Sequence, residues 1–190
     1  MATVASICNL ALRFLNCDPI TVISESNDRA RFMNGVWADV RDGLLHEVAW
    51  NFAVKRNTLA AEVDTPENAY SYQYALPADC LRVLQLNDDD TLAWVVEGGK
   101  LLTDESSAII KYIAQITDTT AWAPLFIEAM AYKLAALGAY PLAKKLELAD
   151  RYEKKYVYAI QRAKAVNLAE NQDHRYEEVS NPLKAVRNAG

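Results

Sequence analysis

The sequence predicts an α+β fold, mainly α, in which helices from both ends of the chain form a bundle that carries an inserted small antiparallel β-sheet. Three observations predict it. Apolar residues recur at steps of three and four at both ends of the chain. In the middle, over about residues 50–116, they alternate or form short runs between turn residues. Residues 171–190 are mostly polar. We therefore expect a single domain over residues 1–170, followed by an extended C-terminal tail.

Two helices are expected at the N-terminal end. The first covers residues 3–16, because Thr3 suits its N-cap and Asp18-Pro19 prevents its continuation. The second covers residues 27–48 and has Ser26 or Asn27 as its N-cap. Its apolar side is formed by Met33, Val36, Trp37, Val40, Leu44 and Val48. Each helix is expected to bury one face against the rest of the bundle.

Gly35 and Gly43 interrupt the second helix. A glycine inside a helix costs about 1 kcal/mol relative to alanine. Two interpretations stay open: the glycines weaken the helix locally, or their missing side chains permit close packing of a neighbouring helix.

The middle of the chain is expected to form an antiparallel sheet of hairpins. Residues 70–76 alternate between apolar or aromatic and polar side chains, which is typical of a half-buried strand. Short runs rich in β-branched and aromatic residues predict further strands at 81–86, 92–97, 100–103 and 108–113, with residues 50–59 as one more. Gly98-Gly99 suits a two-residue turn with positive φ.

The C-terminal third predicts a pair of helices around which the chain is organised. The first covers residues 124–139, with Pro124 in its first turn and Gly138 followed by Pro141 as a stop signal. It is apolar on nearly every side, so protein must surround it. The second is amphipathic, covers residues 142–168 and reaches about 40 Å, more than a small domain needs to cover its own core.

Part of this helical pair is therefore expected to contact another chain. The residues expected to form this contact are Phe126, Met130, Leu134, Tyr152 and Tyr156.

Composition limits the classes of function. A net charge of −5 and a pI near 5.1 oppose a protein whose main task is to coat nucleic acid. The three cysteines, Cys8, Cys17 and Cys80, are widely spaced and form no C-x-x-C pair. We therefore expect them to be reduced thiols. The first residues lack the pattern of an export signal, and no run is long and apolar enough to suggest a membrane span.

No catalytic residue, metal site or cofactor is expected. His46 and His174 are the only histidines, and no cysteine or carboxylate lies at ligand spacing from them. Asp88-Asp89-Asp90 could hold a hard cation, but an EF-hand loop needs an oxygen donor where Leu92 lies, so a solvated turn is favoured. No serine lies in a G-x-S-x-G pattern.

Two lysine pairs, Lys144-Lys145 and Lys154-Lys155, lie ten residues apart on the long helix. Ten residues make close to three helical turns, so the pairs could share a face that meets phosphate. A solvated face is favoured, given the acidic total.

Three runs of the sequence resemble a phage family. They are WNF at 50–52, YQYALPADCLRV at 72–83 and WVVEGGKLLTD at 94–104. The likeness continues through residues 110–113, Thr117-Asp118 and the helix at 126–137, so it covers roughly residues 1–168. In order and spacing these runs resemble the head-to-tail adaptor proteins of short-tailed bacteriophages, of the tail tubular protein A or gatekeeper type.

The resemblance implies a structural virion protein of the tail or neck, assembled in the host cytoplasm, and not an enzyme. Such a protein forms a ring, expected to be a dodecamer, that joins the portal protein to the tail nozzle protein and surrounds passing double-stranded DNA without sequence specificity. No membrane is involved. The resemblance also implies that the C-terminal segment reaches the portal. The tail residues expected to dock there are Arg175, Tyr176, Val179, Leu183, Val186 and Arg187.

Two other classes stay open at this point. One is a peptidoglycan-degrading, virion-associated enzyme. The other is a monomeric helical interaction module that serves a cellular partner.

Overall fold

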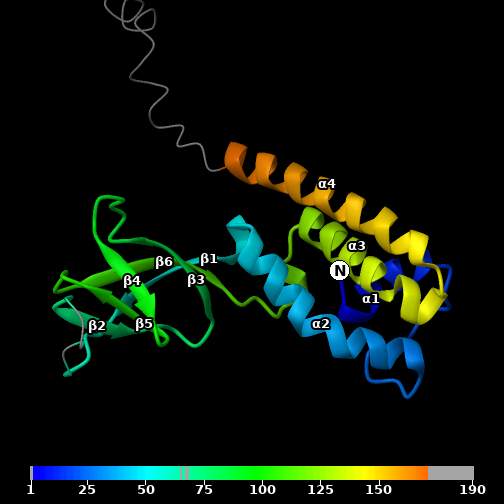
Figure 1. Ribbon diagram of the computed structural model, residues 1–190, viewed down its shortest axis with the longest axis horizontal. Helices are drawn as coiled ribbons and strands as arrows, with labels where there is room; N and C mark the ends of the chain where they lie inside the picture. Colours follow the sequence, from blue (N-terminus) through cyan, green and yellow to red (C-terminus); the bar gives the residue numbers. More distant parts are fainter. Residues whose placement is uncertain (1, 65, 67–68, 171–190) are drawn as a thin grey trace, which may run out of the picture.

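The structure is a computed structural model that describes residues 2–64, 66 and 69–170 of the 190-residue chain. It confirms the α+β class. Four α-helices of the described residues gather at one end of an elongated molecule, and the strands gather at the other (Figure 1). We call the helical part the bundle and residues 54–114 the β module. The helices are α1 (Val4–Phe14), α2 (Asp28–Glu47), α3 (Pro124–Ala143) and α4 (Leu146–Glu170).

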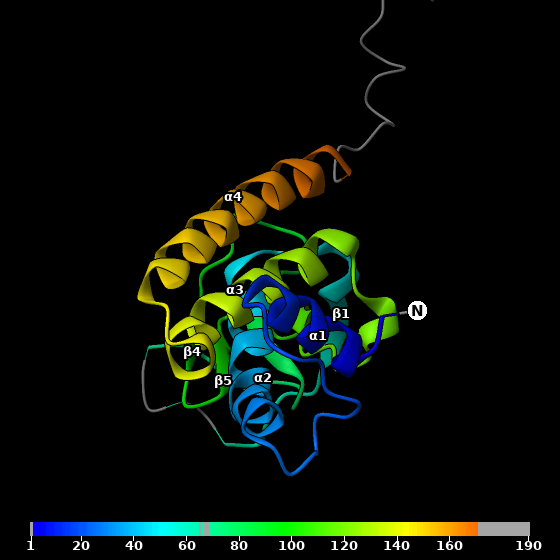
Figure 2. The same ribbon diagram turned by 90° about the vertical axis from the view of Figure 1, so that its right-hand side faces the viewer.

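Helix α3 lies at the centre of the bundle and packs against α1, α2 and α4. Figure 2 shows α4 on the outside, with α3 between it and the N-terminal helices. The α3 side chains that are wholly buried are Phe126, Ala129, Met130, Ala131, Leu134, Ala135 and Ala139. The nearly all-apolar sequence of this helix is therefore explained by protein on most of its sides.

The N-terminal helices begin where their capping residues predict. Thr3 and Ser6 form a capping box, in which each side chain accepts a hydrogen bond from the backbone N–H of the other. Asn27, and not Ser26, caps α2 by accepting from the N–H of Ala30 at 2.9 Å. Both helices end within two residues of the predicted boundary.

The expected stop at Gly138 and Pro141 is wrong. Helix α3 continues through both residues to Ala143 and ends at Lys144, whose φ of 56° is left-handed. Pro141 lies in the last turn, where its missing N–H removes only one bond close to the end of the helix. As a consequence α4 starts at Leu146, four residues later than expected.

The glycines of α2 do not permit close packing. A Cβ added at Gly35 or Gly43 would meet no atom within 4 Å. The crowded glycine is Gly138 on α3, where an added Cβ would lie 3.0 Å from Leu15 Cδ1 and 3.3 Å from Phe32 Cε1. Of the three glycines in α2 and α3, Gly138 is therefore the one whose missing side chain permits close packing. The sequence predicts a helix stop at that position instead.

We expect Gly35→Ala to raise the free energy of unfolding by about 0.5–1 kcal/mol, because alanine restricts the unfolded chain and has open space in the folded one. Gly138→Ala is the matched contrast, since its methyl group must displace Leu15. Urea unfolding of both variants measures the difference. Equal gains at the two positions would contradict this account of Gly138.

The β module contains two three-stranded antiparallel sheets, where the sequence predicted one. The first has the strand order β1 (Val54–Leu59), β6 (Ala108–Ala114), β3 (Cys80–Leu86). The second has the order β2 (Tyr72–Ala75), β5 (Lys100–Thr103), β4 (Trp94–Glu97). Among the described strands, the β4–β5 hairpin is the one pair of consecutive strands that are neighbours in a sheet. Its turn, Gly98-Gly99, has the expected positive φ angles of 57° and 77°.

An aromatic cluster marks the junction of the bundle and the β module. Phe126 of α3 is fully buried and meets three other rings edge-on: Trp122 at 4.8 Å, Trp50 at 5.1 Å and Phe52 at 5.3 Å between centroids. Trp50 and Phe52 directly precede β1. The chain therefore enters the β module from a point fixed against the centre of α3.

A polar contact also joins α2 to the end of β6. The Arg41 guanidinium donates to Asp42 Oδ1 at 2.7 Å and to Oδ2 at 2.9 Å. Gln115, the residue after β6, donates to Asp42 Oδ2 at 2.8 Å. Because the Arg41 side chain is only 11% exposed, Asp42 compensates a largely buried cation and at the same time fixes the β module to the bundle.

Candidate functional site

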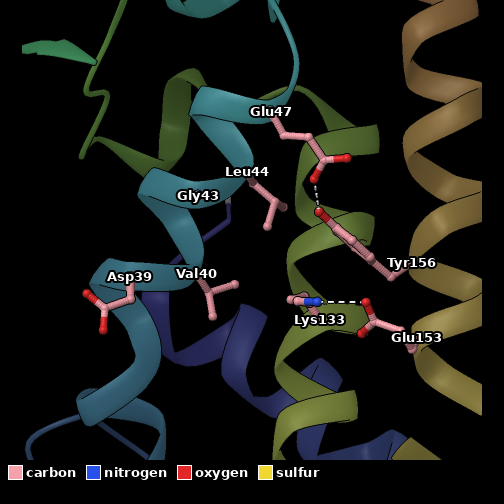
Figure 3. A pocket seen from close by; sticks show the side chains of 8 residues that line it. All are labelled: Asp39, Val40, Gly43, Leu44, Glu47, Lys133, Glu153 and Tyr156. Carbon is pink, nitrogen blue, oxygen red and sulfur yellow. Dashed lines mark hydrogen bonds and ion pairs between the residues drawn. The ribbon is translucent and has the colours of Figure 1, made fainter. Parts of the chain in front are cut away.

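A cavity of about 470 Å³ lies between α2, α3 and α4 (Figure 3). The residues that line it are Asp39, Val40, Gly43, Leu44, Glu47, Lys133, Glu153 and Tyr156. Three carboxylates, an ammonium group and a phenol in one hollow are the side chains from which an acid–base site could be made. This cavity is therefore a candidate reaction site.

Four of the five polar side chains that line the cavity are paired with one another. Lys133 Nζ lies 2.7 Å from Glu153 Oε1 and 4.7 Å above the centre of the Tyr156 ring. The Tyr156 hydroxyl donates to Glu47. Burial, followed by this hydrogen bond, raises the pKa of Tyr156 well above its ordinary value. The phenol therefore stays protonated at neutral pH and donates to Glu47, so that it acts as a link between α2 and α4.

This pairing makes the cavity a poor reaction site. Glycoside hydrolysis requires two carboxylates that face one substrate bond from opposite sides. Glu47 is occupied by Tyr156 and Glu153 by Lys133, whereas Asp39 points away from both pairs in Figure 3. These contacts instead join three helices to one another, so they form a polar network that stabilises the bundle.

No metal-ligand set is found among the described residues, where no group of three His, Cys, Asp or Glu side chains could hold an ion. His46 is exposed in the last turn of α2, and His174 lies outside the described residues. The three aspartates of the β3–β4 loop bind within the chain. Asp88 pairs with Arg56 at 2.8 Å, Asp89 accepts from Thr91, and Asp90 accepts from Gln85.

The residues selected for a ring interface are buried inside the subunit, and that assignment is corrected. Phe126, Met130 and Leu134 are 0% exposed. Tyr152 and Tyr156 are 7% and 6% exposed, and the Tyr152 hydroxyl donates to the carbonyl of Phe14 at 2.7 Å. The periodicity of these residues marked the bundle core, so a contact with another chain must use other side chains of the same helices. The selected tail residues, 175, 176, 179, 183, 186 and 187, lie outside the described residues.

The exposed side of α4 carries a second regular pattern, which the sequence reasoning missed. Its members recur at steps of three and four residues, all are exposed, and they share one side of the helix. We call them the outer stripe: Lys154, Val157, Tyr158, Gln161, Lys164, Ala165 and Leu168. Val157, Tyr158 and Leu168 are 47%, 65% and 70% exposed. The signal was present in the sequence, since these positions alternate with the buried stripe of Tyr156, Ile160 and Ala163.

A second hollow adjoins the outer stripe at the C-terminal end of α4. It has a volume of about 260 Å³ and is lined by Val48, Ala49, Lys164, Asn167 and Leu168. Two of its residues, Lys164 and Leu168, belong to the outer stripe. The stripe therefore ends in a partly apolar recess with a lysine at its edge.

Comparisons with known proteins do not assign the chain to a family. No protein-family model matches it, and a search of curated proteins finds no match. In the part of the chain that the structure describes, no helix has the length and apolar character needed to cross a bilayer.

Proposed function

We propose that this protein is a structural subunit of a phage virion, a head-to-tail adaptor that forms a ring between the portal and the tail nozzle around the DNA channel. The proposal rests on the resemblance of residues 1–168 to the short-tailed phage adaptors. The observation in the structure that carries it is the outer stripe of α4. Three large apolar side chains exposed along one helix are typical of a surface that another protein covers.

The shape of the subunit supports the same proposal. A subunit of a closed ring binds its two neighbours through two different surfaces. Here the bundle and the β module lie at opposite ends of an elongated molecule, and the aromatic cluster and Asp42 fix one to the other (Figure 1). Such a body can hold two interaction surfaces at a constant separation.

The enzymatic alternative has weaker support. Its best candidates, Glu47 and Glu153, are engaged by Tyr156 and Lys133. Zymography of the purified chain on cell-wall substrate tests it, and we expect no clearing. Clearing that is lost in Glu47→Gln or Glu153→Gln would favour the enzyme.

Electron microscopy of the chain mixed with purified portal rings tests the proposed function. We expect an additional ring stacked coaxially on the portal. Tyr158→Ser/Leu168→Ser, which removes apolar contact from the outer stripe, is expected to reduce the fraction of decorated portals. Val22→Ser is the matched control, because Val22 is also exposed, at 49%, but lies between α1 and α2. Portals that stay bare at saturating concentrations of the wild-type chain would contradict the proposal.

A further inference from the structure

The charge of the chain is unevenly distributed. Residues 54–114, the β module, contain ten acidic and five basic side chains. That excess of five acids equals the net charge of −5 of the whole chain, so the remaining residues sum to zero. The β module is therefore a strongly acidic body attached to a neutral bundle.

Five of the ten acidic side chains lie in two loops at one end of the β module. The β3–β4 and β5–β6 loops lie side by side because Asn87 donates to the carbonyl of Ser107 at 3.0 Å and accepts from the N–H of Ile109 at 2.8 Å. We call the acids of these loops the acidic tip: Asp88, Asp89, Asp90, Asp104 and Glu105. Hydrogen bonds from Thr91 hold the pKa of Asp89 below its ordinary value, so this carboxyl is ionised at neutral pH.

The acidic tip faces away from the bundle. Strand β6 starts at the tip with Ala108 and ends beside α2, where Gln115 binds Asp42. The length of β6 therefore separates the tip from the bundle.

The second half of α4 has the opposite charge. Between Lys154 and Ala169 it contains four cations, Lys154, Lys155, Arg162 and Lys164, and no acid. Lys154 has a partner in Asp150 at 3.2 Å, but both side chains are about 80% exposed, so this pair contributes little. Arg162 pairs with Glu128 at 3.1 Å. Lys154 and Lys164 lie on the outer stripe, among its exposed apolar side chains.

These two complementary surfaces cannot meet within one chain. Helix α4 lies across the bundle, and its last turns contact the segment between α2 and β1, where Asn167 donates to the carbonyl of Ala49 at 3.4 Å and Asn51 donates to Glu170 at 2.7 Å (Figure 1). The acidic tip is at the far end of the β module. A second copy of the chain can bring its own tip to the outer stripe.

We propose that the outer stripe of α4 binds the acidic tip of the β module of a second copy. The proposal rests on the proposed function, because a contact between two different surfaces is the head-to-tail arrangement that closes a ring. Lys154 and Lys164 attract the tip and fix its register, whereas Val157, Tyr158 and Leu168 supply the apolar contact. The complementary charges explain why α4 has no acid between Lys154 and Ala169 although the chain is acidic overall.

Two charge-reversal variants test the contact. Lys154→Glu/Lys164→Glu makes the outer stripe acidic. Asp88→Lys/Asp90→Lys/Glu105→Lys gives the tip three lysines against two remaining aspartates, so the tip becomes net basic. Asp89 and Asp104 are left intact because they accept hydrogen bonds from Thr91 and Ser71. Each variant alone then opposes two surfaces of like charge. We expect self-association, measured by sedimentation velocity at low salt, to weaken roughly tenfold or more in each. An equal mixture of the two is expected to recover wild-type association, since the acidic stripe of one variant faces the basic tip of the other.

The controls separate the possible outcomes. Arg31→Glu/Lys145→Glu makes the same change of charge at exposed positions outside the stripe and is expected to associate like wild type. Circular dichroism checks that each variant keeps its helical signal. Failure of the mixture to recover association, or a wild-type chain that stays monomeric throughout, would overturn this inference. Neither result affects the proposed function, which decoration of the portal tests separately.

A DNA duplex is the competing occupant of the cationic half of α4. Fluorescence anisotropy with a short labelled duplex tests it. If Lys154→Glu/Lys164→Glu abolishes DNA binding but leaves self-association intact, the stripe binds phosphate and the inference is wrong.

Discussion

Replacing Phe126 by alanine is expected to lower the free energy of unfolding by about 3–5 kcal/mol, a large part of the roughly 5–15 kcal/mol that stabilises a typical domain. The Phe126 ring is fully buried and contacts Trp50, Phe52 and Trp122. Its loss leaves a cavity at the junction where α3 meets the entry into the β module. Three aromatic neighbours cannot collapse into that space without losing their own contacts.

Urea unfolding, followed by tryptophan fluorescence, measures this effect. Leu137→Ala is the control on the same helix. Leu137 is 43% exposed, so we expect it to cost less than about 1 kcal/mol. A similar small value for Phe126→Ala would show that the aromatic cluster does not hold the two parts of the molecule together.

Replacing Asp42 by alanine is expected to cost about 2–4 kcal/mol. The substitution leaves the Arg41 guanidinium, only 11% exposed, without its carboxylate, and breaking a buried ion pair from one side costs about 3–5 kcal/mol. We place the value somewhat lower because Asp42 itself is 29% exposed. The same change removes the bond from Gln115, so hydrogen exchange is expected to become faster at the end of β6.

Two variants control the Asp42 result. Asp39→Ala lies one turn earlier on α2, at an exposed position, and is expected to change stability by less than about 0.5 kcal/mol. Arg41→Met/Asp42→Ala removes both partners and is expected to recover much of the loss, because no unpaired cation remains. If Asp42→Ala behaves like Asp39→Ala, the contact does not fix the β module to the bundle.

Local signals predicted the elements of this fold well. Thr3, Asn27 and Pro124 each start a helix where their chemistry predicts, and Gly98-Gly99 forms the expected turn. These signals act between residues that are close in the chain, so the sequence displays them directly.

Interactions between residues that are far apart in the chain could not be predicted from such local signals. The pairing of β1 with β6 joins Val54 to Ile113, and no turn signal can indicate such a partner. The packing of Leu15 and Phe32 against Gly138 likewise depends on three helices meeting, and the sequence suggested a helix stop there instead.

The candidate interaction surface was missed for a different reason. From the sequence alone, the length of α4 and its apolar periodicity predict that Tyr152 and Tyr156 contact another chain. In the structure these two tyrosines are buried in the core, whereas Val157, Tyr158 and Leu168 are exposed. A helix with two apolar stripes can bury one in its own fold and offer the other to a partner. Only the packing of α4 against α3 shows which of the two stripes is buried.

Native mass spectrometry of the complex with purified portal rings tests the central claim, that this chain is a subunit of a ring between portal and tail. The account predicts one defined stoichiometry in which the portal ring carries a full ring of about twelve copies, as the resemblance to phage adaptors implies, with no intermediate species at saturation. One or two copies per portal ring, or a broad distribution of copy numbers, would contradict it.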